Sequence, residues 1–195
     1  MPENKQIDRR WKLMVKAFYK GDRVGVLYQL RKMANENVPA AFAELGNIYE
    51  MGGHGLEQDF KKAKYWYNRA IDEADDIEGY IGMARLYYYG KGMQVNYKKA
   101  LEYYSIAEEI NEPVAFFAIG RMYRLGQGVE KNVSTAKEYY RRGVHFGSVQ
   151  SLRALGEIEL ESGNKILGLY YRILAVVKAI PIFIRNRHDP RLRFC

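Results

Sequence analysis

The chain has 195 residues, of which 48% are hydrophobic and 28% charged, which is typical of a folded protein and excludes a disordered or collagen-like one. Its one cysteine, Cys195, excludes an intramolecular disulfide framework and a zinc site built from cysteines, and indicates a reducing compartment. The formal net charge of +8 comes from the two ends, since residues 1–38 carry +5, residues 39–148 carry −1 and residues 149–195 carry +4. A nucleic-acid binder more often has one continuous basic face, so the charge does not favour that function.

The first 38 residues are predicted to form a divergent helix pair that caps the chain, with a break at Gly21 and Asp22. The opening sequence MPENKQIDRRWKLMV has no apolar core of signal-peptide length. No later run reaches the ~18 uncharged apolar residues that a transmembrane helix needs. We therefore expect neither a leader peptide nor a membrane-spanning helix.

Residues 39–148 contain three copies of one pattern. A small residue marks each copy and recurs once afterwards, at spacings of 38, 36 and 36 residues: Gly46, Ala84, Gly120 and Gly156. A tyrosine column and an alanine column follow it: Tyr49, Tyr87 and Tyr123, then Ala63, Ala100 and Ala136. Aromatic pairs form a fourth column: Trp66–Tyr67, Tyr103–Tyr104, Tyr139–Tyr140 and Tyr170–Tyr171. Such a period is typical of a solenoid, in which stacked units bury a continuous core.

Each copy is predicted to be two helices joined by a glycine loop. Apolar or small residues recur with helical spacing in the first helix, which Pro39 or Pro113 opens in two copies. Glycines follow this helix in every copy, as expected of left-handed caps: Gly52 to Gly55, Gly90 to Gly92 and Gly126 to Gly128. The second helix is expected to begin at a side-chain N-cap: Asp59, Asn96 or Asn132.

The last segment, residues 149–195, is predicted to be a shortened fourth repeat followed by an apolar helix and a basic tail. Residues 166–184 are the most apolar stretch, and Pro181 is expected to kink or end the helix. Four arginines follow it: Arg185, Arg187, Arg191 and Arg193. We expect this helix to cover the last layer of the core. A dimer interface and contact of residues 166–195 with an anionic membrane are the alternatives.

Together these columns resemble the Sel-one-like repeat (SLR) family, whose members are related to tetratricopeptide repeats. The first copy matches the family pattern at the following positions: Leu45–Gly46, Tyr49, Gly53, Gly55, Asp59, Lys62–Ala63 and Trp66–Tyr67. The next two copies match it in register. The resemblance implies an all-α, right-handed α/α superhelical solenoid of about four to five helix pairs with a long C-terminal capping helix.

The resemblance also implies a scaffold for protein–protein contact, of which bacterial adaptors and toxin-neutralising immunity proteins are examples. The first helices line the concave face in such solenoids. One stripe of these helices carries the residues that we expect to contact an acidic or polar segment of a partner: Asn47, Arg85, Tyr88, Arg121 and Arg124. The alternative interpretation is a solvated helix face with local Glu–Arg pairs.

No catalytic or metal-binding motif is found. The chain lacks a phosphate-binding glycine loop and a His-Glu-x-x-His motif, and its three histidines lack metal-ligand spacing. Ser134 and Lys137 match a Ser-x-x-Lys box, but they lie in the repeat pattern and the partner motifs of that box are absent. We therefore expect a cytoplasmic, non-enzymatic protein-binding module without metal or cofactor. A membrane-peripheral protein anchored by the apolar C-terminal helix and arginine-rich tail is the alternative.

Overall fold

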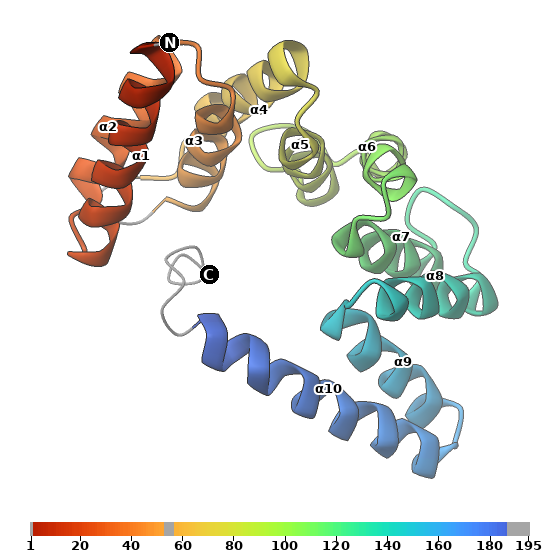
Figure 1. The fold of residues 1–195 in the computed structure, drawn as a ribbon. Coiled ribbons are helices and arrows are strands. Elements are labelled where there is room, and N and C mark those ends of the chain that lie inside the picture. Colours follow the sequence, from red (N-terminus) through yellow and green to blue (C-terminus); the bar gives the residue numbers. More distant parts are fainter. Residues whose placement is uncertain (1, 53–56, 187–195) are drawn as a thin grey trace. The chain divides into compact units, whose positions relative to one another are not determined.

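The structure, a computed structural model, describes residues 2–52 and 57–186 (Figure 1). This part of the chain is all-α, and its ten helices pack in consecutive pairs as a helical repeat solenoid, as predicted. The helices are α1 Pro2–Tyr19, α2 Arg23–Asn35, α3 Ala40–Met51, α4 Phe60–Ala74, α5 Ile77–Tyr89, α6 Tyr97–Glu109, α7 Pro113–Leu125, α8 Val133–His145, α9 Val149–Glu161 and α10 Lys165–Asn186.

The helices fall into two compact units, with α1–α5 in unit 1 and α6–α10 in unit 2. In unit 1 each helix packs against the next one in the chain, and α3 also contacts α5. Unit 2 repeats this arrangement, with α7 also contacting α9. The contacts between alternate helices place the first helices of successive repeats side by side within each unit, which is how stacked repeats share a core.

The predicted caps form for local reasons. Gly90 and Gly126 end α5 and α7 in the left-handed region, with φ of 65° and 72°, where a side chain would be strained. Three side chains begin the second helices by accepting a hydrogen bond from a backbone amide three residues later: Asp59, Asn96 and Asn132. Residues 53–56, which include part of the first predicted glycine loop, lie outside the described residues.

The small-residue column allows close packing of the aromatic pairs. A Cβ atom at Gly120 would lie 2.7 Å from the Tyr140 ring, so only glycine fits there. Tyr67 is approached in the same way by Gly46 of α3 and by Gly82 of α5. The contact of Gly82 is an additional one between layers, because Tyr67 belongs to the preceding copy, and the column residue Ala84 is itself fully buried.

Helix α10 continues past the proline. It runs from Lys165 through Pro181 to Asn186, so Pro181 does not end the helix, whereas the kink that was the other expected outcome stays a prediction. Inside a helix a proline keeps a helical φ, but it removes one backbone hydrogen bond and its ring clashes with the carbonyl of the preceding turn, so a kink at this position is still expected. The rest of the predicted basic tail, with Arg187, Arg191, Arg193 and Cys195, lies outside the described residues.

Candidate functional site

In unit 1, Arg85 joins two neighbouring layers. Its Nη2 atom donates to Asn47 Oδ1 at 2.7 Å and to Glu50 Oε2 at 2.8 Å, both on α3. The same Nη2 atom lies 2.9 Å from the hydroxyl of Tyr67 on α4. The predicted residues Asn47 and Arg85 are therefore brought together, where they bond each other across the layers.

Glu50 is the buried centre of this cluster, which we define as Asn47, Glu50, Tyr67, Arg85 and Lys91. Only 3% of the Glu50 side chain is exposed, and Lys91 Nζ lies 3.0 Å from its Oε1 atom. Burial by itself raises the pKa of Glu50, but the hydrogen bonds and positive charge of Arg85, helped by Tyr67 and Lys91, hold that pKa below its ordinary value. Glu50 is therefore ionised at neutral pH, and the cluster carries one negative and two positive charges.

The buried hydroxyl of Tyr67 forms hydrogen bonds with three other residues of this cluster. Its hydroxyl lies 2.7 Å from Glu50 Oε2 and 2.8 Å from Asn47 Oδ1, and it can donate its single proton to one of them. Burial raises the pKa of Tyr67 far above its ordinary value, so the hydroxyl keeps its proton. A buried hydroxyl without partners would be costly, so these polar residues have a structural task.

Lys91 lies at the exposed edge of the cluster, in the loop after α5. One third of its side chain is exposed, and Nζ lies 5.6 Å from the centre of the Tyr89 ring and 5.9 Å from that of Phe60. Tyr89 is itself 51% exposed. An ammonium beside aromatic rings is a common binding feature. This pair was not predicted from the sequence, because a Gly-x-Gly loop after a helix indicates only a cap.

In unit 2, the predicted residue Arg124 is paired with two carboxylates of α9. Its guanidinium lies 2.8 Å from Glu157 and 2.6 Å from Glu161, and these two carboxylates are 53% and 65% exposed. The guanidinium of Arg121 lies 5.7 Å from the centre of the Phe117 ring, one helical turn away. Arg124 thus ties α7 to α9, which is the local pairing that the alternative interpretation expected.

Tyr88, one of the predicted contact residues on the first helices, is buried. Only 6% of this residue is exposed, and its ring packs edge-to-face against Tyr89 at 4.8 Å. The prediction that Tyr88 projects from an exposed face is therefore wrong. The helix turns by 100° per residue, so the neighbouring Tyr89 is the one that reaches solvent.

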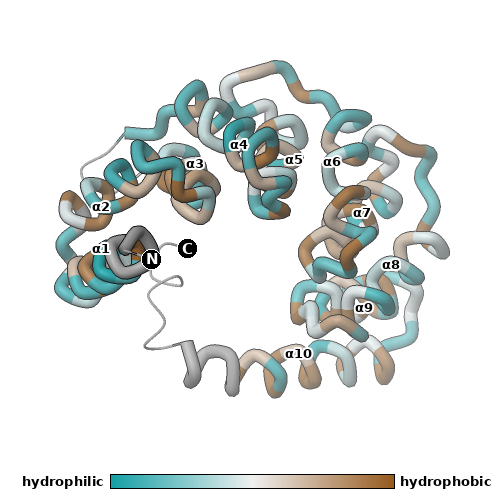
Figure 2. Tube along the Cα trace, turned by 45° about the horizontal axis from the view of Figure 1, so that its top comes forward, coloured by the Kyte–Doolittle hydropathy of each residue, from teal (hydrophilic) through white to brown (hydrophobic). Residues whose placement is uncertain are grey.

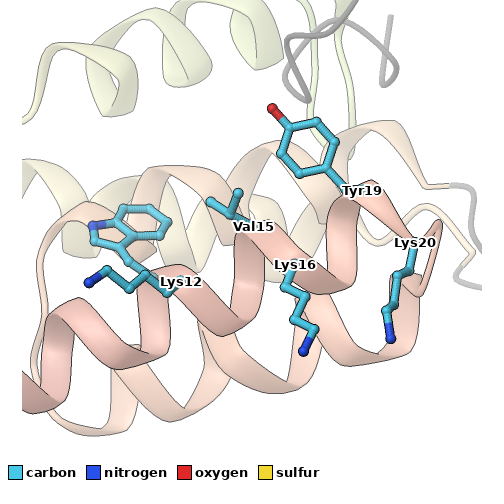
Figure 3. A pocket seen from close by; sticks show the side chains of 6 residues that line it. Lys12, Val15, Lys16, Tyr19 and Lys20 are labelled. Atoms are coloured by element: carbon cyan, nitrogen blue, oxygen red, sulfur yellow. The ribbon is translucent and has the colours of Figure 1, made fainter.

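A second exposed surface lies on α1, at the start of unit 1. Figure 3 shows a shallow hollow along this helix, with Val15 and Tyr19 on one side and Lys16 and Lys20 on the other. Trp11 and Lys12 complete the lining. The aromatic or aliphatic residues and the lysines each recur every four residues, which is the spacing of one helix face. Both rows have a spacing that can be read from the sequence, but they lie outside the repeat pattern and match no binding motif.

The lysine of the Ser-x-x-Lys box makes a contact between helices. Lys137 of the Ser-x-x-Lys box forms an ion pair with Glu159 of α9, 2.7 Å away, which gives this lysine a packing role. Over residues 2–52 and 57–186, no group of three His, Cys, Asp or Glu side chains is placed to hold a metal ion. In the same residues, no helix is both long enough and apolar enough to cross a membrane.

Comparisons with known proteins agree with this architecture. The pattern described as Sel1 repeat matches residues 39–75, 77–110 and 113–144, more than half of the chain. A solved Sel1 repeat protein from Oxalobacter formigenes is 27% identical, with a TM-score of 0.68 over 84% of this chain and 71% of that one.

A protective antigen of uropathogenic Escherichia coli, which displays an SLR fold, is 22% identical with a TM-score of 0.69 over 83% of this chain and 35% of its own. At that identity the likeness is one of fold. No match to a curated protein was found. The three matched segments, in register with the helix pairs α3–α4, α5–α6 and α7–α8, show that the chain belongs to the Sel1 repeat family.

Proposed function

We propose that this chain is a non-enzymatic protein-binding scaffold whose partner presents acidic side chains to unit 1, at a surface centred on Lys91 and Tyr89. Sel1 repeats mediate protein interactions. The observation that carries the proposal is the partly exposed Lys91, fixed by a buried carboxylate and flanked by aromatic rings.

The geometry favours binding because Lys91 is already ordered. An ammonium group has three donors, and Glu50 takes one of them. A lysine that is held in place before binding loses less side-chain entropy when a partner arrives. Since the cluster also contains Arg85, a carboxylate from the partner meets a site with more positive than negative charge.

The scaffold would serve as a bacterial adaptor or as a toxin-neutralising immunity protein, as its resemblance to the family implied. We propose a cytoplasmic location on the basis of the single cysteine. In unit 2, Arg121 and Arg124 remain the proposed contact residues. The ion pairs of Arg124 with two exposed glutamates make it the weaker candidate, because a partner must displace those carboxylates.

The test is a quantitative pull-down from the native host with matched baits. Lys91→Ala removes the exposed cation, and Lys61→Ala removes an equally charged, exposed side chain of α4. Both variants change the net charge by the same amount, so non-specific attraction is equal. Circular dichroism confirms that each variant is folded.

The expected result is one stoichiometric protein that wild type and Lys61→Ala retain and Lys91→Ala loses. The identity of that protein separates an adaptor from an immunity protein. A partner retained equally by all three baits would overturn the site. Its loss on Arg124→Gln would instead move the contact to unit 2.

A further inference from the structure

Helix α10 exposes a continuous apolar stripe. Seven of its residues are at least half exposed and recur at intervals of three or four: Ile166, Leu169, Tyr170, Ile173, Val176, Val177 and Ile180. Their exposed fractions range from 50% to 87%. Figure 2 shows the corresponding hydrophobic segments along α10. Isolated exposed apolar residues are normal, but a row of this length marks a contact surface.

The opposite side of α10 is already used by the core of unit 2. A Cβ atom at Gly168 would lie 2.6 Å from Leu160 of α9, and Ala175 is only 2% exposed. Tyr171 packs against the buried cluster that contains Tyr140. The helix is therefore apolar on both sides, and the stripe is not needed to attach α10 to α9.

The charges of α10 are all of one sign. The helix contains Lys165, Arg172, Lys178 and Arg185 and no acidic residue. At 3.6 residues per turn the stripe occupies about one third of the circumference, and Arg172 and Lys178 lie on either side of it, roughly 40° and 80° beyond its margins. Long basic side chains at the edges of an apolar face can extend to lipid headgroups while the face is buried.

We propose that the stripe of α10 binds the surface of an anionic lipid bilayer, with the helix lying in the plane of the interface. The complementarity of charge selects this occupant. A second copy of the chain would bring two purely basic helices together, whereas anionic headgroups neutralise them. The stripe extends for about 21 Å at 1.5 Å per residue, and Tyr170 within it is a side chain suited to the interface.

The experiment measures sedimentation of the full chain with vesicles of neutral phosphatidylcholine, or of phosphatidylcholine with about 30% phosphatidylglycerol, which gives the surface a negative potential. Ile173→Ser/Val177→Ser interrupts the stripe, and Val114→Ser/Val133→Ser changes two exposed valine side chains of α7 and α8 as the matched control. Arg172→Gln/Lys178→Gln removes the flanking charge, and Lys98→Gln/Lys131→Gln matches it. Light scattering gives the oligomeric state of each variant.

The proposal expects binding to the anionic vesicles only. Interrupting the stripe should weaken partitioning at least ~10-fold, and removing charges at its edges should weaken it roughly fivefold per charge, while both control pairs bind like wild type. No binding to either vesicle overturns the proposal, as does binding that is equal for the stripe variant and its control. A wild-type dimer that the stripe variant converts to a monomer also overturns it, because the occupant is then a second copy.

Discussion

Tyr67 packs against glycines from two helices, and this packing predicts that Gly82→Ala destabilises the protein. A Cβ atom at Gly82 would lie 2.4 Å from the Tyr67 ring, about 1 Å inside the 3.4 Å at which ordinary contact begins. The ring has little room to move, because Gly46 approaches it as closely and its hydroxyl is bonded to Glu50 and Arg85.

Two opposing effects set the magnitude. Glycine to alanine inside a helix normally stabilises by about 1 kcal/mol. Overpacking of a filled core costs about 1–3 kcal/mol, and the restrained ring places Gly82→Ala at the upper end of that range. The net loss is therefore about 1–2 kcal/mol, which lowers the Tm by roughly 2–8 °C in a chain of this size.

Urea unfolding followed by circular dichroism measures this loss, and a second background tests its cause. In a Tyr67→Leu protein the ring is absent, so Gly82→Ala should become neutral or stabilising, with a coupling energy of about 1–3 kcal/mol. The reasoning fails if Gly82→Ala stabilises the wild-type protein. It also fails if the substitution costs the same in both backgrounds.

Three further substitutions test the layers and the cap. Gly120→Leu should cost about 1–3 kcal/mol in urea unfolding, because even a Cβ there overlaps the Tyr140 ring, and an unchanged midpoint would contradict this packing. Glu50→Gln should cost about 1.5–3 kcal/mol at pH 7. Since the folded-state pKa of Glu50 is lowered, its stabilisation is present above the unfolded pKa and is lost as the pH falls through the folded pKa. The difference between wild type and Glu50→Gln should therefore shrink in acid. Asn132→Ala should cost about 1 kcal/mol and Asn132→Asp much less, and equal midpoints for both variants would exclude a capping role.

Local features of the fold were predictable because neighbours in the chain determine them. The left-handed caps at Gly90 and Gly126 and the N-caps at Asn96 and Asn132 depend on residues within one turn. The repeat period then indicates which helices stack. The aromatic pairs and small residues predicted close packing, to which Gly82 adds a contact with Tyr67 of the preceding copy.

The candidate site could be predicted only in part, because it depends on a polar group from another helix. A helical stripe shows that Asn47 and Arg85 share a face, and periodicity alone suggests that such a face is exposed. The structure differs because Asn47, Glu50 and Arg85 form hydrogen bonds with the buried hydroxyl of Tyr67. Their side chains therefore face the layer of α4 and not the solvent. Tyr89 and Lys91 reach solvent at the end of α5, where the loop leaves the repeat pattern.

A signal for these contacts nevertheless lies in the sequence, at the repeat period. Glu50 and Arg85 are 35 residues apart, Glu108 and Arg142 are 34 apart, and Arg124 lies 33 residues before Glu157. Opposite charges separated by about one repeat thus meet across adjacent layers, where each pair ties one copy to the next. Lys91 is 41 residues from Glu50, outside that period, and joins a carboxylate that Arg85 already neutralises. Lys91 is therefore not needed for the ion pair between the layers, and this makes it the cation best able to bind a carboxylate of another protein.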